Sequence, residues 1–252
     1  MATSEQTADQ STTGASLFWP LLLLAMAFPS LLAWTEFVAL AMGHGGSANP
    51  VQQTTLALGK MVQFSLPVVF FWLLERSWPR PGKASLRGVP LGVAFGVVVA
   101  AGMFGLYYGF LRDSSVFGNT PAMVRRKLEE FGLDTPAAFF AFAGFLCVIH
   151  SFLEEYYWRW FVFGQLRRVV PLGSAILVSS FAFMAHHVIV LNVYFPGQFW
   201  TATLPFSLCV AGGGVVWAWL YQRSGSLLGP WLGHLLIDAA ILVIGYDLVF
   251  GG

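Results

Sequence analysis

Residues 136–163 read PAAFFAFAGFLCVIHSFLEEYYWRWFVF. The segment is long enough to cross a membrane as a helix, which takes roughly 20 apolar residues for about 30 Å of hydrocarbon. It also carries a histidine, two adjacent carboxylates and an arginine. Such groups are rare inside lipid and by default indicate a functional site or a buried ion pair. The segment therefore predicts a membrane span and also the place where the chemistry is concentrated.

The rest of the chain is similarly apolar. Of 252 residues, 57% are hydrophobic and only 10% are charged, whereas a soluble domain averages about 25% charged residues. The formal net charge is +1, which argues against binding to nucleic acid. The composition excludes a soluble enzyme, a disordered chain and a basic nucleic-acid binder. It predicts an all-α polytopic transmembrane bundle with the lipid bilayer as its surroundings.

Seven stretches are long and apolar enough to span a membrane, and lipid favours helices because it offers the backbone no hydrogen-bond partner. The expected spans are 17–42, 53–75, 89–111, 136–163, 172–194, 200–221 and 226–250. Residues 1–16 are polar and are expected to form a disordered tail. Residues 17–252 are expected to form a single transmembrane domain whose polar motifs fall within about 136–250.

The loop cations predict an orientation. Seven of them fall on one side of the expected spans: Arg76, Arg80, Lys83, Arg87, Arg167, Arg168 and Arg223. Four fall on the other side: Arg112, Arg125, Arg126 and Lys127. Cytoplasmic loops carry the excess of Lys and Arg, so we expect the N-terminus inside. The expected location is a bacterial cytoplasmic membrane.

The longest loop, 112–135, contains TPAMVRRKLEEFGLD from residue 120. Thr120 before Pro121 is typical of a helix N-cap with proline in the first turn. Apolar residues then alternate with charges at roughly helical spacing. Two interpretations fit this pattern: a short amphipathic helix on the membrane surface, or a solvated connector.

The fourth span contains two pairs of ionisable residues at helical spacing. His150 and Glu154 are four residues apart, as are Glu155 and Arg159, and such pairs share a helix face. Adjacent carboxylates point about 100° apart on a helix, so both cannot use the arginine equally. We expect Glu155 to pair with Arg159, and Glu154 to face the bundle interior as a base or ligand.

Spans five and seven carry the other ionisable groups at comparable depth. Span five contains His186 and His187, and span seven contains His234 and Asp238, again four residues apart. A glutamate can accept a proton from water while a histidine orients that water. Neutral histidines can also donate hydrogen bonds to an oxyanion. Alternatively, two histidines and a carboxylate could hold zinc.

Two further ionisable residues lie within spans but outside this group. Glu36 of the first span is expected to have a structural or interfacial role. Lys60 of the second span is expected near one end of its helix, where its ammonium could reach the membrane interface along its apolar stem.

Three motifs in order resemble a known family. EEYYWR (Glu154–Arg159) fits EExxxR, FMAHH (Phe183–His187) fits FxxxH, and HLLID (His234–Asp238) fits HxxxN/D. On successive helices of a polytopic protein, this trio resembles the CPBP intramembrane proteases, also called the Abi or type 2 CAAX prenyl endopeptidase family. The resemblance covers about 140–245. It implies an endopeptidase that acts on a membrane protein or a lipidated peptide.

The resemblance also implies catalytic roles. Glu154 and His187 correspond to the residues that activate water for attack on a peptide bond. His234 and Asp238 correspond to the pair thought to stabilise the oxyanion. This chain has aspartate where the motif also allows asparagine, and a carboxylate donates a hydrogen bond only when protonated. Asp238 is therefore expected either to act directly or to orient His234.

Glu155 and Arg159 correspond to the supporting pair of the first motif. Two adjacent histidines could each be the histidine of the FxxxH motif. The spacing from Phe183 selects His187, and a helix shifted by one residue would select His186. We expect His187 to be catalytic and His186 to support it. His150 lies outside the motifs and is expected to pack between helices or to act behind the site.

The cofactor expectation follows from the same residues. The family was long described as metal-dependent and later as a glutamate-type protease. We expect no cofactor, with zinc as the alternative, held by Glu154, His187 and His234. Two other functions would also place carboxylates inside the membrane: a non-catalytic immunity or partner-binding protein, and a proton-coupled transporter.

Overall fold

The computed structural model describes residues 3–40, 50–75 and 84–251, with side chains from residue 16 onward. This part of the chain is helical and contains no strand, as the composition predicted. Seven segments are long and apolar enough to cross a membrane: Ser16–Ala39, Pro50–Leu74, Val89–Leu111, Pro136–Val169, Leu172–Tyr194, Phe199–Ser224 and Leu228–Phe250. Their bounds agree with the expected spans to within a few residues.

Several spans combine α-helical and π-helical stretches; η4 is a short 3-10 helix. In chain order the elements are α1 (Thr3–Trp34), η1 (Thr35–Ala39), α2 (Pro50–Leu74), α3 (Val89–Leu106), η3 (Tyr107–Leu111), η4 (Ser115–Phe117), α4 (Thr120–Phe131), α5 (Pro136–Phe145), η5 (Leu146–His150), α6 (Ser151–Glu155), η6 (Tyr156–Phe163), α7 (Gly164–Val169), α8 (Leu172–Tyr194), η7 (Phe199–Thr203), α9 (Leu204–Ser224) and α10 (Leu228–Phe250).

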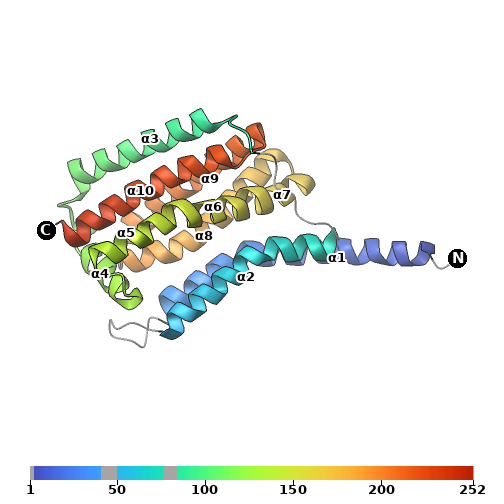
Figure 1. Ribbon diagram of the computed structural model, residues 1–252, viewed down its shortest axis with the longest axis horizontal. Coiled ribbons are helices and arrows are strands. Elements are labelled where there is room, and N and C mark those ends of the chain that lie inside the picture. Colours follow the sequence, from blue (N-terminus) through green and yellow to red (C-terminus); the bar gives the residue numbers. More distant parts are fainter. Residues whose placement is uncertain (1–2, 41–49, 76–83, 252) are drawn as a thin grey trace.

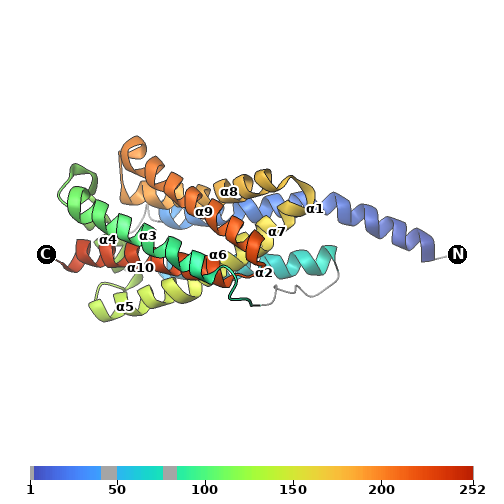
Figure 2. The same ribbon diagram turned by 90° about the horizontal axis from the view of Figure 1, so that it is seen from above.

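The helices form one elongated bundle with the two termini at opposite ends (Figure 1). Within it α3 packs along α10, α8 packs along α9, and α1 lies against α2 and α8. The continuous fourth span, from α5 to α7, passes among them and touches α10, α8 and α9. The view from above shows the same pairing of α3 with α10 (Figure 2). This arrangement places the fourth span against α8 and α10, the two helices that carry the other polar motifs.

The N-terminal segment differs from the expectation. Helix α1 begins at Thr3, so the described part of the tail, 3–16, is helical and not disordered; residues 1–2 lie outside the described residues. The first turn of a helix costs conformational entropy because several residues are fixed for one hydrogen bond, whereas each later residue that is fixed adds a hydrogen bond of its own. The first span therefore provides a helix that the polar residues before it extend.

Helix α1 is hydrogen-bonded to the fourth span. Pro29 lies inside α1 and has no N–H, so the carbonyl of Ala25 loses its helical donor. The hydroxyl of Tyr157 donates a hydrogen bond to this carbonyl at 2.6 Å. Tyr157 is fully buried among aromatic residues of η6. The proline thus creates an acceptor that attaches the first span to the centre of the bundle.

Glycines bring α3 and α10 into backbone contact. A Cβ at Gly92 would lie 2.0 Å from the carbonyl oxygen of Gly229, and one at Gly96 would lie 2.8 Å from that of Gly233. Small residues four apart allow membrane helices to approach this closely. The contact ends one residue before His234, so it also fixes the height of that side chain relative to α3.

The loop before the fourth span contains the expected helix, α4. Its N-cap is Asn119 and not Thr120, and no side chain caps it. The Thr120 hydroxyl instead bonds to the carbonyl of Tyr194 at the end of α8, at 3.2 Å. Leu128 of α4 packs with Phe139 and Val249. Helix α4 is therefore packed on the end of the bundle and is not a solvated connector.

Glu36 lies in η1 and is fully buried. Its backbone carbonyl accepts a hydrogen bond from the Gln52 side chain of α2 at 2.8 Å. Lys127 of α4 provides the nearby positive charge. Glu36 therefore belongs to the packed end of the bundle near α4 and has no exposed surface at an interface.

The glycine contact yields a stability prediction. Gly92→Ala should lower the free energy of unfolding by about 1–3 kcal/mol, the usual cost of overpacking, because the new methyl group meets backbone. Gly102→Ala on the same helix is the control, since nothing lies within 4 Å of its Cβ position and alanine favours the helix by about 1 kcal/mol. Unfolding in detergent, followed by tryptophan fluorescence, measures both. Equal stability of the two variants would contradict the close contact.

Candidate active site

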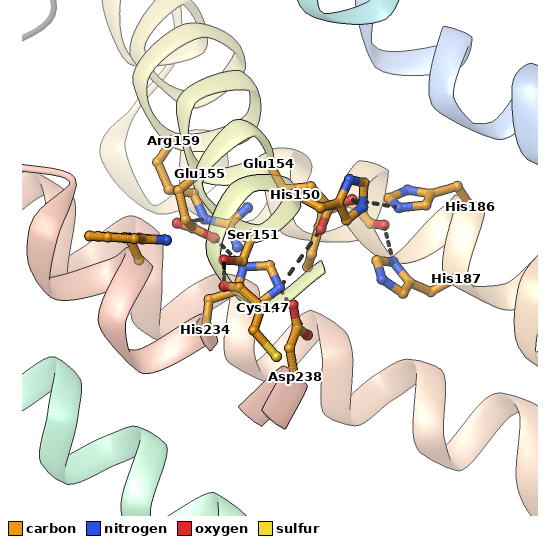
Figure 3. A network of polar contacts seen from close by, with 12 residues as sticks. Cys147, His150, Ser151, Glu154, Glu155, Arg159, His186, His187, His234 and Asp238 are labelled. Carbon is orange, nitrogen blue, oxygen red and sulfur yellow. Dashed lines mark hydrogen bonds and ion pairs between the residues drawn. The ribbon is translucent and has the colours of Figure 1, made fainter. Parts of the chain in front are cut away.

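The ionisable side chains of the three motifs come together at one level of the bundle (Figure 3). Glu154 projects from α6, His186 and His187 from α8, and His234 and Asp238 from α10. The two α8 imidazoles lie on one side of Glu154, and the α10 pair lies on the other. The structure therefore assembles in one place the residues that the sequence separates by more than 80 positions.

The two carboxylates of the fourth span face different partners. They end α6 (Ser151–Glu155), a short α-helical stretch between the π-helical stretches η5 and η6. Consecutive residues point about 100° apart, which directs Glu154 toward α8 and Glu155 toward α10 and Arg159. π-Helical turns often occur at functional sites, and here they flank both carboxylates.

Glu155 joins two groups at once. Its Oε2 lies 3.1 Å from Nε of Arg159, and both side chains are almost completely buried. Its Oε1 accepts a hydrogen bond from Nδ1 of His234 at 2.9 Å. The ion pair matches the interpretation of the sequence. The second contact was not predicted, and it gives Glu155 a direct part in orienting the His234 ring.

Aromatic rings complete the surroundings of Arg159. The guanidinium lies 4.6 Å from the ring centroid of Phe183 and 5.2 Å from that of Trp217. Trp217 also stacks on His234, with ring centroids 4.3 Å apart and an interplanar angle of 17°. Trp217 of α9 is a site residue that sequence reasoning missed, because no spacing links it to the motifs.

The Glu154 carboxylate is enclosed by imidazoles. Its Oε1 lies 3.3 Å from Nε2 of His150 and 3.5 Å from Nε2 of His186, and its Oε2 lies 3.7 Å from Nε2 of His234. The side chain is 4% exposed. Within the described part of the chain, no lysine or arginine forms an ion pair with Glu154. The carboxylate therefore depends on histidines for its hydrogen bonds.

His150 has a more direct position than the sequence suggested. It contacts Glu154 itself, is more exposed than Glu154 at 22%, and meets the edge of the Phe64 ring of α2, with ring centroids 6.3 Å apart. The four-residue spacing to Glu154 was the available signal. Because His150 lies outside the family motifs, its contact with Glu154 follows from the structure of this chain and not from the motif pattern.

The two neighbouring histidines of α8 have different contacts. His186 contacts Glu154 and stacks on Trp158, with parallel rings 5.9 Å apart. The Nδ1 of His187 lies 3.0 Å from the carbonyl oxygen of Phe183. A carbonyl only accepts hydrogen bonds, so Nδ1 carries the proton and Nε2 keeps a lone pair. The ring centroids of the two histidines are 4.1 Å apart.

Asp238 faces the other nitrogen of His234. Its Oδ1 lies 3.5 Å from Nε2 of His234, and its side chain is 20% exposed. The Nδ1 atom is already bonded to Glu155, so Glu155 fixes the ring and Asp238 adds a second carboxylate beside Nε2. With Nδ1 donating to Glu155, a hydrogen bond donated by Nε2 to a further acceptor would require the imidazolium form.

The same residues were tested for a fit to zinc. Among the described residues, no group of three or more His, Cys, Asp or Glu side chains has an arrangement that would hold a metal ion. The contacts of Glu154 are with His150, His186 and His234, so His187, one of the three ligands of the zinc alternative, is not in ion-pair contact with it. The residues as arranged do not fit a three-ligand metal site.

A helical multi-pass membrane protein with a buried glutamate among histidines is the class that the fold and site define. Residues 136–240 match the family described as Rce1-like, type II CAAX prenyl endopeptidase Rce1-like. The match runs from the start of α5 into α10 and includes all three motifs. No curated protein and no solved structure matches the chain. The family match confirms the resemblance of the motifs: residues 136–240 are similar to the CPBP, or CAAX protease, family.

Arg159 provides a stability prediction. Arg159→Ala should lower the free energy of unfolding by about 3–5 kcal/mol, because it leaves the buried Glu155 carboxylate without its counter-charge. Arg223→Ala is the matched control, because Arg223 also lies over a tryptophan ring, at 5.1 Å from Trp219, but is exposed. It should change stability by about 0.5 kcal/mol or less. Similar losses in both variants, measured by thermal unfolding in detergent, would contradict the structural role of the buried pair.

Proposed function

We propose that the protein hydrolyses a peptide bond of a membrane-associated substrate, with Glu154 as the general base. The family supports an activity of the CAAX intramembrane protease type. The observation that carries the mechanism is the position of Glu154, buried between the α8 imidazoles and the α10 pair. A carboxylate so placed can take a proton from a water molecule that enters between the helices.

The first step is attack by water on the scissile carbonyl carbon. Glu154 accepts one proton of the water, and the lone pair on Nε2 of His187 orients the water as a hydrogen-bond acceptor. His150 and His186 hold Oε1 of Glu154, which leaves Oε2 on the side of His234. The new C–O bond forms as the π electrons of the carbonyl move to its oxygen.

The second step is stabilisation and collapse of the tetrahedral intermediate. The Nε2–H of His234 donates to the oxyanion, while Glu155 holds Nδ1 and Asp238 balances the charge of the ring. Donors fixed where negative charge develops are usually the largest contribution to such catalysis. The oxyanion then re-forms the carbonyl, the C–N bond breaks, and the proton on Glu154 passes to the leaving nitrogen.

The mechanism is proposed without a metal, and this can be measured directly. Purified active protein should contain far less than one zinc per chain by elemental analysis. A strong chelator followed by gel filtration should leave the hydrolysis rate unchanged. Loss of activity that added zinc restores would contradict the metal-free mechanism and favour the zinc-dependent alternative.

Glu154→Gln tests the proposed base. The purified variant should hydrolyse peptides and candidate membrane substrates about 10²–10⁴-fold more slowly, the usual contribution of a general base. Glu36→Gln is the control, because it removes another buried carboxylate outside the site and should keep activity. Full activity of Glu154→Gln would contradict the assignment. Absence of hydrolysis by the wild type, together with proton-driven uptake into vesicles, would instead favour a transporter.

Substitutions of the two α8 histidines should lower the hydrolysis rate by different amounts. His187→Ala should lower kcat by about 10²-fold or more, because the water loses its acceptor. His186→Phe keeps a ring to stack on Trp158 but removes a contact to Glu154, so a smaller loss is expected. The reverse order, measured on one peptide substrate, would assign the water-orienting role to His186.

A further inference from the structure

Lys60 lies near the middle of a membrane span. It is ten residues from the start of α2 at Pro50 and fourteen from its end at Leu74, or about 15 and 21 Å at 1.5 Å per residue. Helix α2 begins three residues earlier than the expected span, so Lys60 lies farther from the end of its helix than the sequence indicated.

The ammonium of Lys60 lies on the α2 side of the candidate active site. Its Nζ is 5.7 Å from the ring centroid of Phe64, the ring that meets His150 edge-on. The charge of Lys60 interacts electrostatically with Glu154 and with His186. Lys60 therefore borders the part of the site formed by the imidazoles that hold Oε1 of Glu154.

Lys60 has no ion-pair partner among the described residues; its contact is the face of an aromatic ring. By contrast, Arg159, at the opposite side of the site, is paired with Glu155. An unpaired ammonium inside hydrocarbon is costly, and charged residues there commonly mark a path or a ligand site. The three N–H donors of Lys60 are thus available to an anion that enters the site.

The site is electrically asymmetric around Glu154. On the α10 side, the carboxylates of Glu155 and Asp238 lie against Arg159 and His234, so the charges there are paired. On the α2 side lies the cation Lys60. A substrate whose scissile carbonyl reaches Glu154 and His234 would therefore find an unpaired cation for a carboxylate on the α2 side.

We propose that Lys60 binds a carboxylate of the peptide substrate and so contributes to substrate specificity. This inference rests on the proposed hydrolysis of a peptide at Glu154. A peptide can supply the carboxylate from its C-terminus or from an acidic side chain. Lys60 acts in either case by a charge-assisted hydrogen bond, which is stronger than a neutral one.

Equilibrium binding tests the proposal without requiring turnover. The probe is a short, fluorescently labelled apolar peptide, prepared as the free acid and as the C-terminal amide, with anisotropy measured on full-length protein in detergent. Wild type should bind the acid about tenfold or more tightly than the amide, the effect of one desolvated charge pair. Lys60→Gln should bind both forms equally.

Two further variants serve as controls. Lys60→Arg keeps the charge and should retain the preference. Lys127→Gln removes another lysine that lies over a phenylalanine ring, at 5.5 Å from Phe37, but outside the site, and should also retain the preference. The ratio of acid to amide binding is measured within one preparation, so partial unfolding of a variant does not alter it.

A second probe pair separates the two sources of the carboxylate. An amidated peptide with one glutamate is compared with the same peptide carrying glutamine. A preference for glutamate that Lys60→Gln abolishes supports binding of an acidic side chain. Three results would overturn the proposal. The wild type binds the acidic member of neither probe pair more tightly than the neutral member, Lys60→Gln keeps the preference of the wild type, or Lys60→Gln lowers the affinity for the acid and the amide by the same factor. A Lys60-dependent preference without hydrolysis of any peptide would contradict the proposed function alone.

Discussion

The shared carboxylate of Glu155 is the interaction on which the rest of the site depends. One oxygen is paired with Arg159 and the other with Nδ1 of His234. Removing two charges from water is expensive unless every lone pair and proton finds a partner. Phe183 and Trp217 cover the guanidinium, and Trp217 also stacks on His234. The pair thus fixes α6, α8, α9 and α10 relative to one another, and the adjacent Glu154 is left free for chemistry.

The sequence was sufficient for the parts of the fold that depend on simple physical limits. Apolar length defines seven spans because the hydrocarbon thickness is fixed. The spacing of Glu155 and Arg159 identifies an ion pair because residues four apart share a helix face. Both features survive errors of a few residues in the helix bounds. The level at which Glu154 meets His234 is similarly robust, because each residue adds only about 1.5 Å.

Features that depend on helix rotation were beyond the sequence. His186 and His187 differ by one position, or about 100°, and α8 is apolar on every side, so the pattern does not say which ring meets Glu154. The contact of Glu155 with His234 depends in the same way on how α6 turns toward α10. The N-cap of α4 differs from the prediction because Thr120 bonds to another helix.

The hydrogen bond between Tyr157 and Ala25 has a mechanical consequence. Family similarity begins only at residue 136, so the first span stands outside the matched region. Yet Pro29 exposes a carbonyl that Tyr157, three residues after Glu154, holds at 2.6 Å. A tilt of α1 must either break this bond or pull on the turn that carries Glu154. The first span, outside the matched region, is thereby mechanically coupled to the matched region.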